Sequence, residues 1–114
     1  MRHLKSCLLI ASLAAAGSFA NGAAAGVLDG LHQKVRVGSK LCFADHSHAG
    51  SSFGAPTKGH ALQAAIKDWS GFTVLEYGQE WGNFSLSWAK TIQCQPSSHG
   101  QWSCQIEARP CRAG

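Results

Sequence analysis

Two periodicities divide the chain after residue 56. An apolar stripe with the spacing of a helix comes first and comprises Ala61, Leu62, Ala65, Ile66 and Trp69. Thr57 follows a proline and can cap the first turn with its side-chain oxygen. Ser70-Gly71 is a stop signal, because glycine readily takes the left-handed conformation that ends a helix. The pattern predicts one helix that begins after Thr57 and ends at Gly71.

Strand patterns follow this helix. The segment FTVLEY, residues 72–77, is rich in strand formers and is ended by Gly78. Residues 83–95 alternate almost perfectly between apolar and polar side chains, and residues 101–108 do the same. The alternative for the first of these two segments is a helix, with an apolar face made of Trp81, Phe84 and Trp88. The alternation matches more positions, so we expect three strands.

The last two strands are expected to form a hairpin around the turn signal PSSHG, residues 96–100. Pairing around this turn places Cys94 opposite Cys104 and Ile92 opposite Ile106, with both apolar faces on the same side of the sheet. The predicted fold class is α+β. One helix packs on a three-stranded antiparallel β-meander, and two disulfides staple the domain.

The chain before the helix is interpreted as an extended segment and a loop. Lys34–Val37 and Lys40–Phe43 are short candidate strands. Residues 44–56 are rich in glycine, serine and histidine and are typical of a polar loop. We expect residues 26–56 to form one domain with residues 57–114.

Residues 1–25 have the features of a secretory signal peptide. A basic start with Arg2 and Lys5 precedes a short apolar run, and the small residues after it offer cleavage near residue 20 or residue 25. A transmembrane anchor is not expected, because a helix needs roughly 20 apolar residues to span a bilayer. The expected location is periplasmic or extracellular.

Cleavage of this leader would remove Cys7 and leave four cysteines. An even number in a short exported chain predicts two disulfides. The preferred pairs are Cys42–Cys111 and Cys94–Cys104, because the hairpin places the second pair directly opposite each other. The other two pairings remain open. The cysteine spacings lack the C-x2-C knuckle of common zinc modules.

The charge argues against one class of partner. The formal net charge of +4 falls to +2 when Arg2 and Lys5 leave with the leader. The remaining charges are scattered, whereas nucleic-acid binding requires a dense basic face. Nucleic acid is therefore not an expected partner. The partner stays unidentified, with an envelope polysaccharide or another protein as the candidates.

The second half of the chain contains, in order, AIKDW, FTVLEYG, Trp81 and an ending of the form C…WSC…ARPC. This order of core aromatics, glycine and cysteines resembles small secreted bacterial proteins of uncharacterised function. The resemblance implies an exported domain with disulfides. It carries no known activity, so no catalytic or binding residue follows from it.

Histidines and an acid gather in the predicted loop. His46 and His48 are two residues apart, so in an extended segment their side chains point the same way and can share a metal ion. Asp45 is a further candidate, either as a ligand or as a hydrogen-bond partner that orients a ligand histidine. His60 is the fourth candidate ligand. Neutral imidazole suits Zn, Cu or Ni. The favoured interpretation is a solvated polar loop, because glycine and serine leave ligands mobile, and a metal site is the alternative.

An enzyme is not expected, because the cysteines are paired and no glycine-rich phosphate loop is present. Trp69, Trp88 and Trp102 are expected in the core. Tyr77 and Trp81 are candidates for an exposed aromatic patch that binds a ligand, and the favoured interpretation is that they cover the end of the core. The sequence predicts a small exported, non-enzymatic binding or envelope-associated module without a cofactor. The alternatives are a periplasmic transition-metal binder and a secreted inhibitor or effector of another protein.

Overall fold

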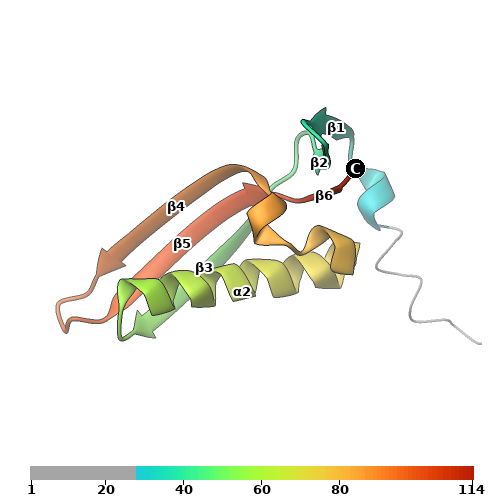
Figure 1. Ribbon diagram of the computed structural model, residues 1–114. Helices are drawn as coiled ribbons and strands as arrows, with labels where there is room; N and C mark the ends of the chain where they lie inside the picture. The colour runs from blue at the N-terminus through green and yellow to red at the C-terminus, as the bar shows by residue number, and fades with distance from the viewer. Residues whose placement is uncertain (1–27) are drawn as a thin grey trace, which may run out of the picture.

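The computed structural model describes residues 28–114, which form two three-stranded antiparallel sheets and one long helix (Figure 1). The first sheet, in the order β1-β2-β6, comprises β1 (Lys34–Val37), β2 (Lys40–Phe43) and β6 (Cys111–Ala113). The second, in the order β3-β5-β4, comprises β3 (His48–Ala55), β5 (Trp102–Arg109) and β4 (Trp88–Pro96). The helix α2 (Lys58–Tyr77) covers one face of the second sheet. The short 3-10 helices are η1 (Asp29–Leu31), η2 (Gln79–Trp81) and η3 (Phe84–Leu86).

The α+β class is confirmed, but the single three-stranded meander is wrong. The last part of the chain contributes one strand to each sheet, because β5 ends at Arg109 and β6 begins at Cys111. Pro110 lies between them, and a proline cannot donate a hydrogen bond to a strand ladder. After it the chain pairs with β2 rather than with the second sheet. The two short strands predicted before residue 44 have the predicted bounds.

The helix α2 begins where predicted but does not end at Gly71. The Thr57 side chain accepts a hydrogen bond from the amide of His60, which caps the first turn. The helix then continues to Tyr77, so the strand predicted for residues 72–77 is wrong. Buried side chains recur at every fourth position, namely Ala61, Ala65, Trp69, Thr73 and Tyr77. Burial of the last two outweighs the cost of a helical glycine, which is about 1 kcal/mol relative to alanine.

The predicted polar loop is largely the strand β3, which pairs with β5 at one edge of the second sheet and packs against α2. Gly50 marks the closest approach of strand and helix. A Cβ at this position would lie 2.7 Å from the Cβ of Trp69 and 2.8 Å from its amide nitrogen. Two residues further on, the Ser52 hydroxyl donates to the Ala61 carbonyl at 2.6 Å. At Gly50 and Ser52 the helix leaves room only for small side chains, and the small residues of this segment are what predicted a loop.

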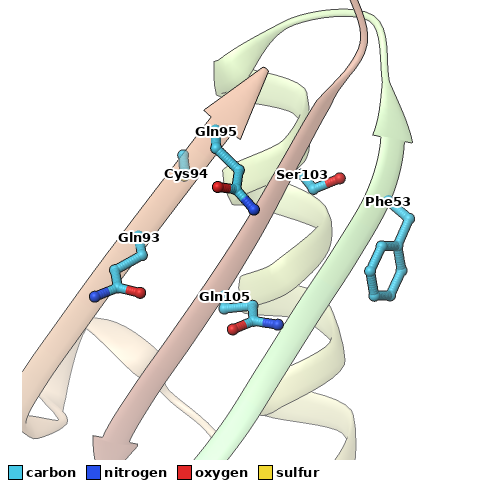
Figure 2. Close-up of a pocket in the computed structure, with 6 residues that line it drawn as sticks. All are labelled: Phe53, Gln93, Cys94, Gln95, Ser103 and Gln105. Atoms are coloured by element: carbon cyan, nitrogen blue, oxygen red, sulfur yellow. The ribbon is translucent and has the colours of Figure 1, made fainter. Parts of the chain in front are cut away.

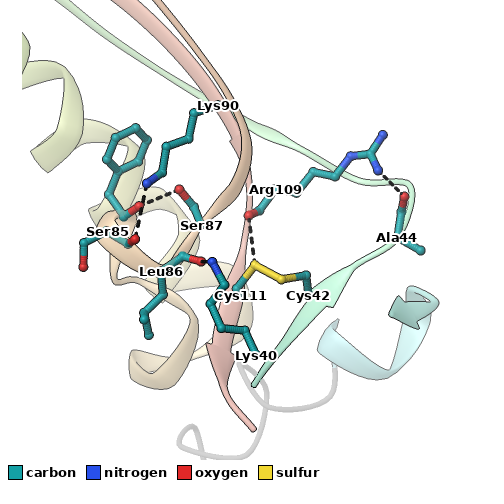
Figure 3. Close-up of a disulfide and its surroundings, with 10 residues drawn as sticks. Lys40, Cys42, Ala44, Ser85, Leu86, Ser87, Lys90, Arg109 and Cys111 are labelled. Atoms are coloured by element: carbon teal, nitrogen blue, oxygen red, sulfur yellow. Dashed lines mark hydrogen bonds between the residues drawn. A yellow bond between two sulfur atoms is a disulfide. The ribbon is translucent and has the colours of Figure 1, made fainter. Parts of the chain in front are cut away.

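Both predicted disulfides are present. Cys94 lies opposite Cys104 in the hairpin of β4 and β5, and a disulfide joins them. Cys42 lies opposite Cys111 on β2 and β6, and the second disulfide joins these two (Figure 3). Each sheet therefore carries one covalent link between neighbouring strands.

The hairpin of β4 and β5 also pairs Ile92 with Ile106, as predicted, but the expected burial of the apolar face of β4 is wrong, because Ile92 is 48% exposed. Its first strand begins later than predicted, at Trp88, because the residues before it form η3. A register shift between Trp88 and Thr91, together with a φ of 54° at Ala89, bends the start of the strand. Trp88 is consequently 37% exposed, and its predicted place in the core is wrong.

Two buried clusters hold the layers together. The larger lies between α2 and the second sheet and is centred on Trp69, whose indole nitrogen donates to the Ala108 carbonyl at 3.3 Å. The smaller comprises Phe43, Tyr77 and Trp81 and joins the first sheet to the end of α2. The second cluster fixes the end of the helix against the turn that leads from β2 to β3.

The predicted leader, residues 1–25, lies outside the described residues. None of the helices formed by residues 28–114 combines the length and the apolar character that a membrane crossing requires. The two disulfides are compatible with an oxidising compartment.

Two glycines provide a matched test of the packing: Gly50 lies in β3 where the strand meets α2, and Gly71 lies on the exposed side of α2. Gly50→Ala should destabilise the protein by about 1–3 kcal/mol, because the added methyl group has no space between strand and helix. Gly71→Ala should stabilise it by up to about 1 kcal/mol, because a Cβ there meets nothing within 4 Å and alanine favours the helix. Urea unfolding measures both changes, and equal effects would contradict the packing.

The two disulfides should differ in their contribution to stability. Cys42 and Cys111 are 69 residues apart, whereas Cys94 and Cys104 are 10 residues apart. The loop-entropy relation gives about 4 kcal/mol for the long separation and about 3 kcal/mol for the short one. Paired Cys→Ala variants, compared by urea unfolding, should show the larger loss for Cys42 and Cys111. The reverse order would show that chain entropy is not the main contribution.

Candidate metal centre

The last turns of α2 meet the connection between the two sheets (Figure 1). His46 lies in this connection, His48 begins β3, and Glu76 comes from the end of α2. One potential ligand atom from each of these three residues lies within 4.8 Å of the other two. We refer to His46, His48 and Glu76 as the His/Glu cluster.

The ring of His48 is buried and is oriented by the helix. Its Nδ1 lies 3.1 Å from the hydroxyl oxygen of Thr73. That hydroxyl donates its own hydrogen to the Trp69 carbonyl at 2.7 Å, so it can only accept from the imidazole. Nδ1 therefore carries the hydrogen. In the neutral ring, Nε2 therefore carries the lone pair and is an acceptor.

This lone pair points toward a carboxylate. Nε2 of His48 lies 3.1 Å from Oε2 of Glu76, and the Tyr77 hydroxyl lies 3.2 Å from the same nitrogen. An imidazole lone pair and a carboxylate oxygen are both acceptors, and the Tyr77 hydroxyl can donate its single hydrogen to only one of them, so a proton or a cation between them would satisfy both. Two ligand atoms that each lie roughly 2.0–2.1 Å from one tetrahedral zinc ion would be about 3.3 Å apart. The observed spacing is close to that value.

Of a proton and a metal cation, burial disfavours the proton, because it disfavours the charged form of the imidazole. It lowers the pKa of His48 below the ordinary value of 6.5, an effect that the charge of Glu76 opposes but does not cancel. Burial also lowers the pKa of His46, and the neighbouring His32 adds to this shift. Both imidazoles are therefore mainly neutral near pH 7, which is the form that ligates metal ions.

A second layer of side chains surrounds the His/Glu cluster. The Tyr77 hydroxyl lies 3.3 Å from Nε2 of His32 as well as beside His48. Burial raises the pKa of Tyr77 far above its ordinary value, and the hydrogen bond and charge of Glu76 raise it further, so the hydroxyl remains a neutral donor. The ring of His32 stacks on His46 with a centroid distance of 4.2 Å. His32 thus places a further imidazole beside the cluster.

The connection that carries His46 is anchored to its surroundings. A guanidinium nitrogen of Arg109 donates to the Ala44 carbonyl (Figure 3). The Ala44 amide donates to the carbonyl of Gln33 at 2.9 Å. The Ser47 hydroxyl donates to the carboxylate of Glu107 on β5. The sequence-based expectation of mobile ligands therefore does not fit this segment.

The two other candidate ligands lie outside the His/Glu cluster. Asp45 is exposed, and its charge raises the pKa of His46 only as the weakest of several influences. His60 is exposed in the first turn of α2, where its Nδ1 lies 2.7 Å from the Thr57 hydroxyl. At 1.5 Å per residue, His60 is roughly 24 Å along the helix from Glu76.

The candidate aromatic patch is not on the surface, and the favoured interpretation, packing over the end of the core, is the one that the structure shows. Tyr77 is 3% exposed and Trp81 is fully buried. Both pack against Phe43, whose ring centroid lies 4.7 Å from that of Tyr77 and 4.5 Å from that of Trp81. They close the end of the core because α2 extends far enough to bring Tyr77 inside.

Residues 50–54, GSSFG, also match the letters of a G-x-S-x-G nucleophile motif. The structure gives them a different role. Ser52 is buried in the middle of β3, and its hydroxyl donates to the Ala61 carbonyl rather than to a histidine. The segment is a strand and not the sharp strand-to-helix turn that exposes such a serine.

Sequence reasoning did not assign Glu76 or Thr73 to the site. Both would have been found if the apolar stripe of the helix had been continued past Gly71 at steps of four. That continuation places Thr73 and Tyr77 on the buried face and Glu76 at its border.

Comparisons with protein-family models, curated proteins and solved structures find no match to this chain. No function is therefore transferred by similarity.

The lowered pKa values predict that the metal-free protein loses stability in mild acid. The unfolded chain binds a proton at His46 and His48 more tightly than the folded chain, so stability is full above about pH 6.5 and falls as the pH drops through the folded pKa values. Urea unfolding in the presence of a chelator should give a smaller free energy of unfolding at pH 5.5 than at pH 7.5.

The substitution His48→Gln should flatten this profile, because glutamine does not titrate. His99→Gln is the matched control, since His99 is exposed in the hairpin turn. A profile that rises toward acid, or one that both variants change equally, would contradict the assignment.

Proposed function

We propose that the protein is a small exported module that binds a transition-metal ion, with Zn²⁺ as the best match, at the His/Glu cluster. One observation carries the proposal: Nε2 of the buried His48 lies 3.1 Å from the Glu76 carboxylate, with Nδ1 already fixed by Thr73. This pair of acceptors is satisfied by a cation, and burial disfavours the proton.

The donor set favours zinc or a similar ion. Two imidazoles and one carboxylate match the His₂Glu sets that bind Zn²⁺ with an open fourth position. Neutral imidazole also accepts Cu²⁺ and Ni²⁺, whereas Ca²⁺ and Mg²⁺ require oxygen ligands. The four cysteines of residues 28–114 are held in disulfides and do not compete for the metal ion.

The side chains behind the ligands support the same function. Thr73 orients His48 in the way that carbonyls and carboxylates orient zinc-binding histidines. The Tyr77 hydroxyl can turn its hydrogen toward His32 or Glu76 once Nε2 of His48 binds metal. Such partners fix the ring and raise the affinity of the ligands.

We propose binding of the ion rather than catalysis upon it. A catalytic site is expected to have a substrate pocket beside the metal. The two surface hollows described for residues 28–114 lie on the outer face of the second sheet, and none of their lining residues belongs to the His/Glu cluster. The two disulfides support action in the periplasm or outside the cell, where such links persist.

Metal titration with matched variants tests the proposal. The protein should bind one Zn²⁺ ion. Loss of a hydrogen-bond partner of a ligand typically weakens binding roughly 10–100-fold, and His46→Gln or Glu76→Gln, which removes a ligand, should weaken it more. Thr73→Val should weaken it within that roughly 10–100-fold range, because it removes only the partner of Nδ1. Isothermal titration calorimetry measures each dissociation constant.

His60→Gln and Glu80→Gln are the controls. His60 lies at the opposite end of α2, and Glu80 forms an exposed ion pair with Arg112. Both variants should bind zinc as the unmodified protein does. Equal affinity of Glu76→Gln and Glu80→Gln would rule out the His/Glu cluster, and circular dichroism shows that each variant is folded.

A further inference from the structure

The outer face of the second sheet, which faces away from α2, carries two adjoining hollows. The smaller has a volume of about 160 Å³ and the larger about 450 Å³. Gln93 and Gln105 line both of them, so the two form one continuous depression. Figure 2 shows the side chains of the smaller hollow with α2 behind the sheet. We call the combined depression the outer groove.

The strand register arranges the polar side chains of the outer groove in rows. Ser51 on β3, Gln105 on β5 and Gln93 on β4 lie opposite one another across the sheet. Ser103 and Gln95 form the next row, about 7 Å away because side chains on one face recur every second residue. The row on the other side consists of Ala49, Glu107 and Thr91. The groove therefore repeats amide and hydroxyl groups along the strands.

The lining is polar but almost without charge. Amide side chains both donate and accept hydrogen bonds, and hydroxyl groups do the same. Glu107 is the one charged residue among the lining residues, and it already accepts a hydrogen bond from Ser47. Phe53 lines the smaller hollow and is 78% exposed. An exposed phenyl ring beside amides offers stacking and hydrogen bonding together.

These features fit a neutral polymer that carries many hydroxyl groups better than they fit an anionic polymer, a peptide or a protein. An anionic polymer would meet no cation among the lining residues and would be repelled by Glu107. A peptide strand binds through free backbone groups at a sheet edge, whereas the groove lies over the face of the sheet. A protein partner would be expected to bury more apolar surface than Phe53 provides.

We propose that the outer groove binds a neutral polysaccharide strand, with Phe53 stacked on a sugar ring and Gln93 and Gln105 hydrogen-bonded to its hydroxyl groups. This site is separate from the His/Glu cluster, which lies on the side of the sheet that packs against α2. The two functions therefore fail or hold independently. Polysaccharide binding through this face would keep the metal centre available to solvent.

Titration with neutral hexasaccharides, monitored by NMR, tests the groove. Cellohexaose, maltohexaose and the fully N-acetylated chitohexaose are each added at millimolar concentration to the ¹⁵N-labelled protein. At least one should shift the side-chain amide signals of Gln93 and Gln105, and polygalacturonate should not. Phe53→Ala should weaken that binding roughly 2- to 10-fold, the range for loss of one aromatic contact.

Gln105→Glu is the sharper variant, because it keeps the shape of the side chain and replaces the donor with a negative charge. It should weaken binding at least as much as Phe53→Ala. Gln63→Glu, on the exposed side of α2, is the matched control and should leave binding unchanged. Three results would each overturn the proposal: no shift with any neutral hexasaccharide, binding of polygalacturonate alone, or equal binding by Gln105→Glu and Gln63→Glu.

Discussion

The contact between β3 and α2 is the constraint on which the rest of the structure depends. At Gly50 the strand approaches the backbone of the helix so closely that no side chain fits between them. Ser52 continues the contact with its hydroxyl, which donates to the Ala61 carbonyl and accepts from the Cys104 amide. Strand and helix are thereby held along each other, and His48, at the start of β3, lies against Thr73 and Tyr77.

The same contact explains why a polar cluster exists under the end of the helix. A buried pair such as His48 and Glu76 is a weak source of stability, because desolvation opposes the attraction between the two groups. Burial in fact favours the neutral imidazole, which leaves two acceptors facing each other. We therefore interpret this arrangement, built from residues of two distant segments, as the cation-binding site proposed above.

The sequence was informative where local chemistry decides the structure. The turn signal and the alternation around it predicted the register that pairs Cys94 with Cys104, although the predicted apolar face of β4 is not buried, since Ile92 is 48% exposed. It failed where tertiary packing overrides local preference. Ser70-Gly71 is a stop signal only if nothing beyond it needs burial, and here Thr73 and Tyr77 do. Residues 48–55 have the composition of a loop because a helix lies against them.

These two errors also limited the prediction of the site. The spacing of His46 and His48 indicated that the two side chains can share a metal ion, and the structure places both in the His/Glu cluster. Glu76 was missed, since a helix that ends at Gly71 cannot bring it to β3. X-ray absorption spectroscopy at the zinc edge of the metal-loaded protein tests the account most directly. It should show two imidazoles and further oxygen or nitrogen ligands at roughly 2.0–2.1 Å, and a sulfur ligand at about 2.3 Å or a shell without imidazole would contradict it.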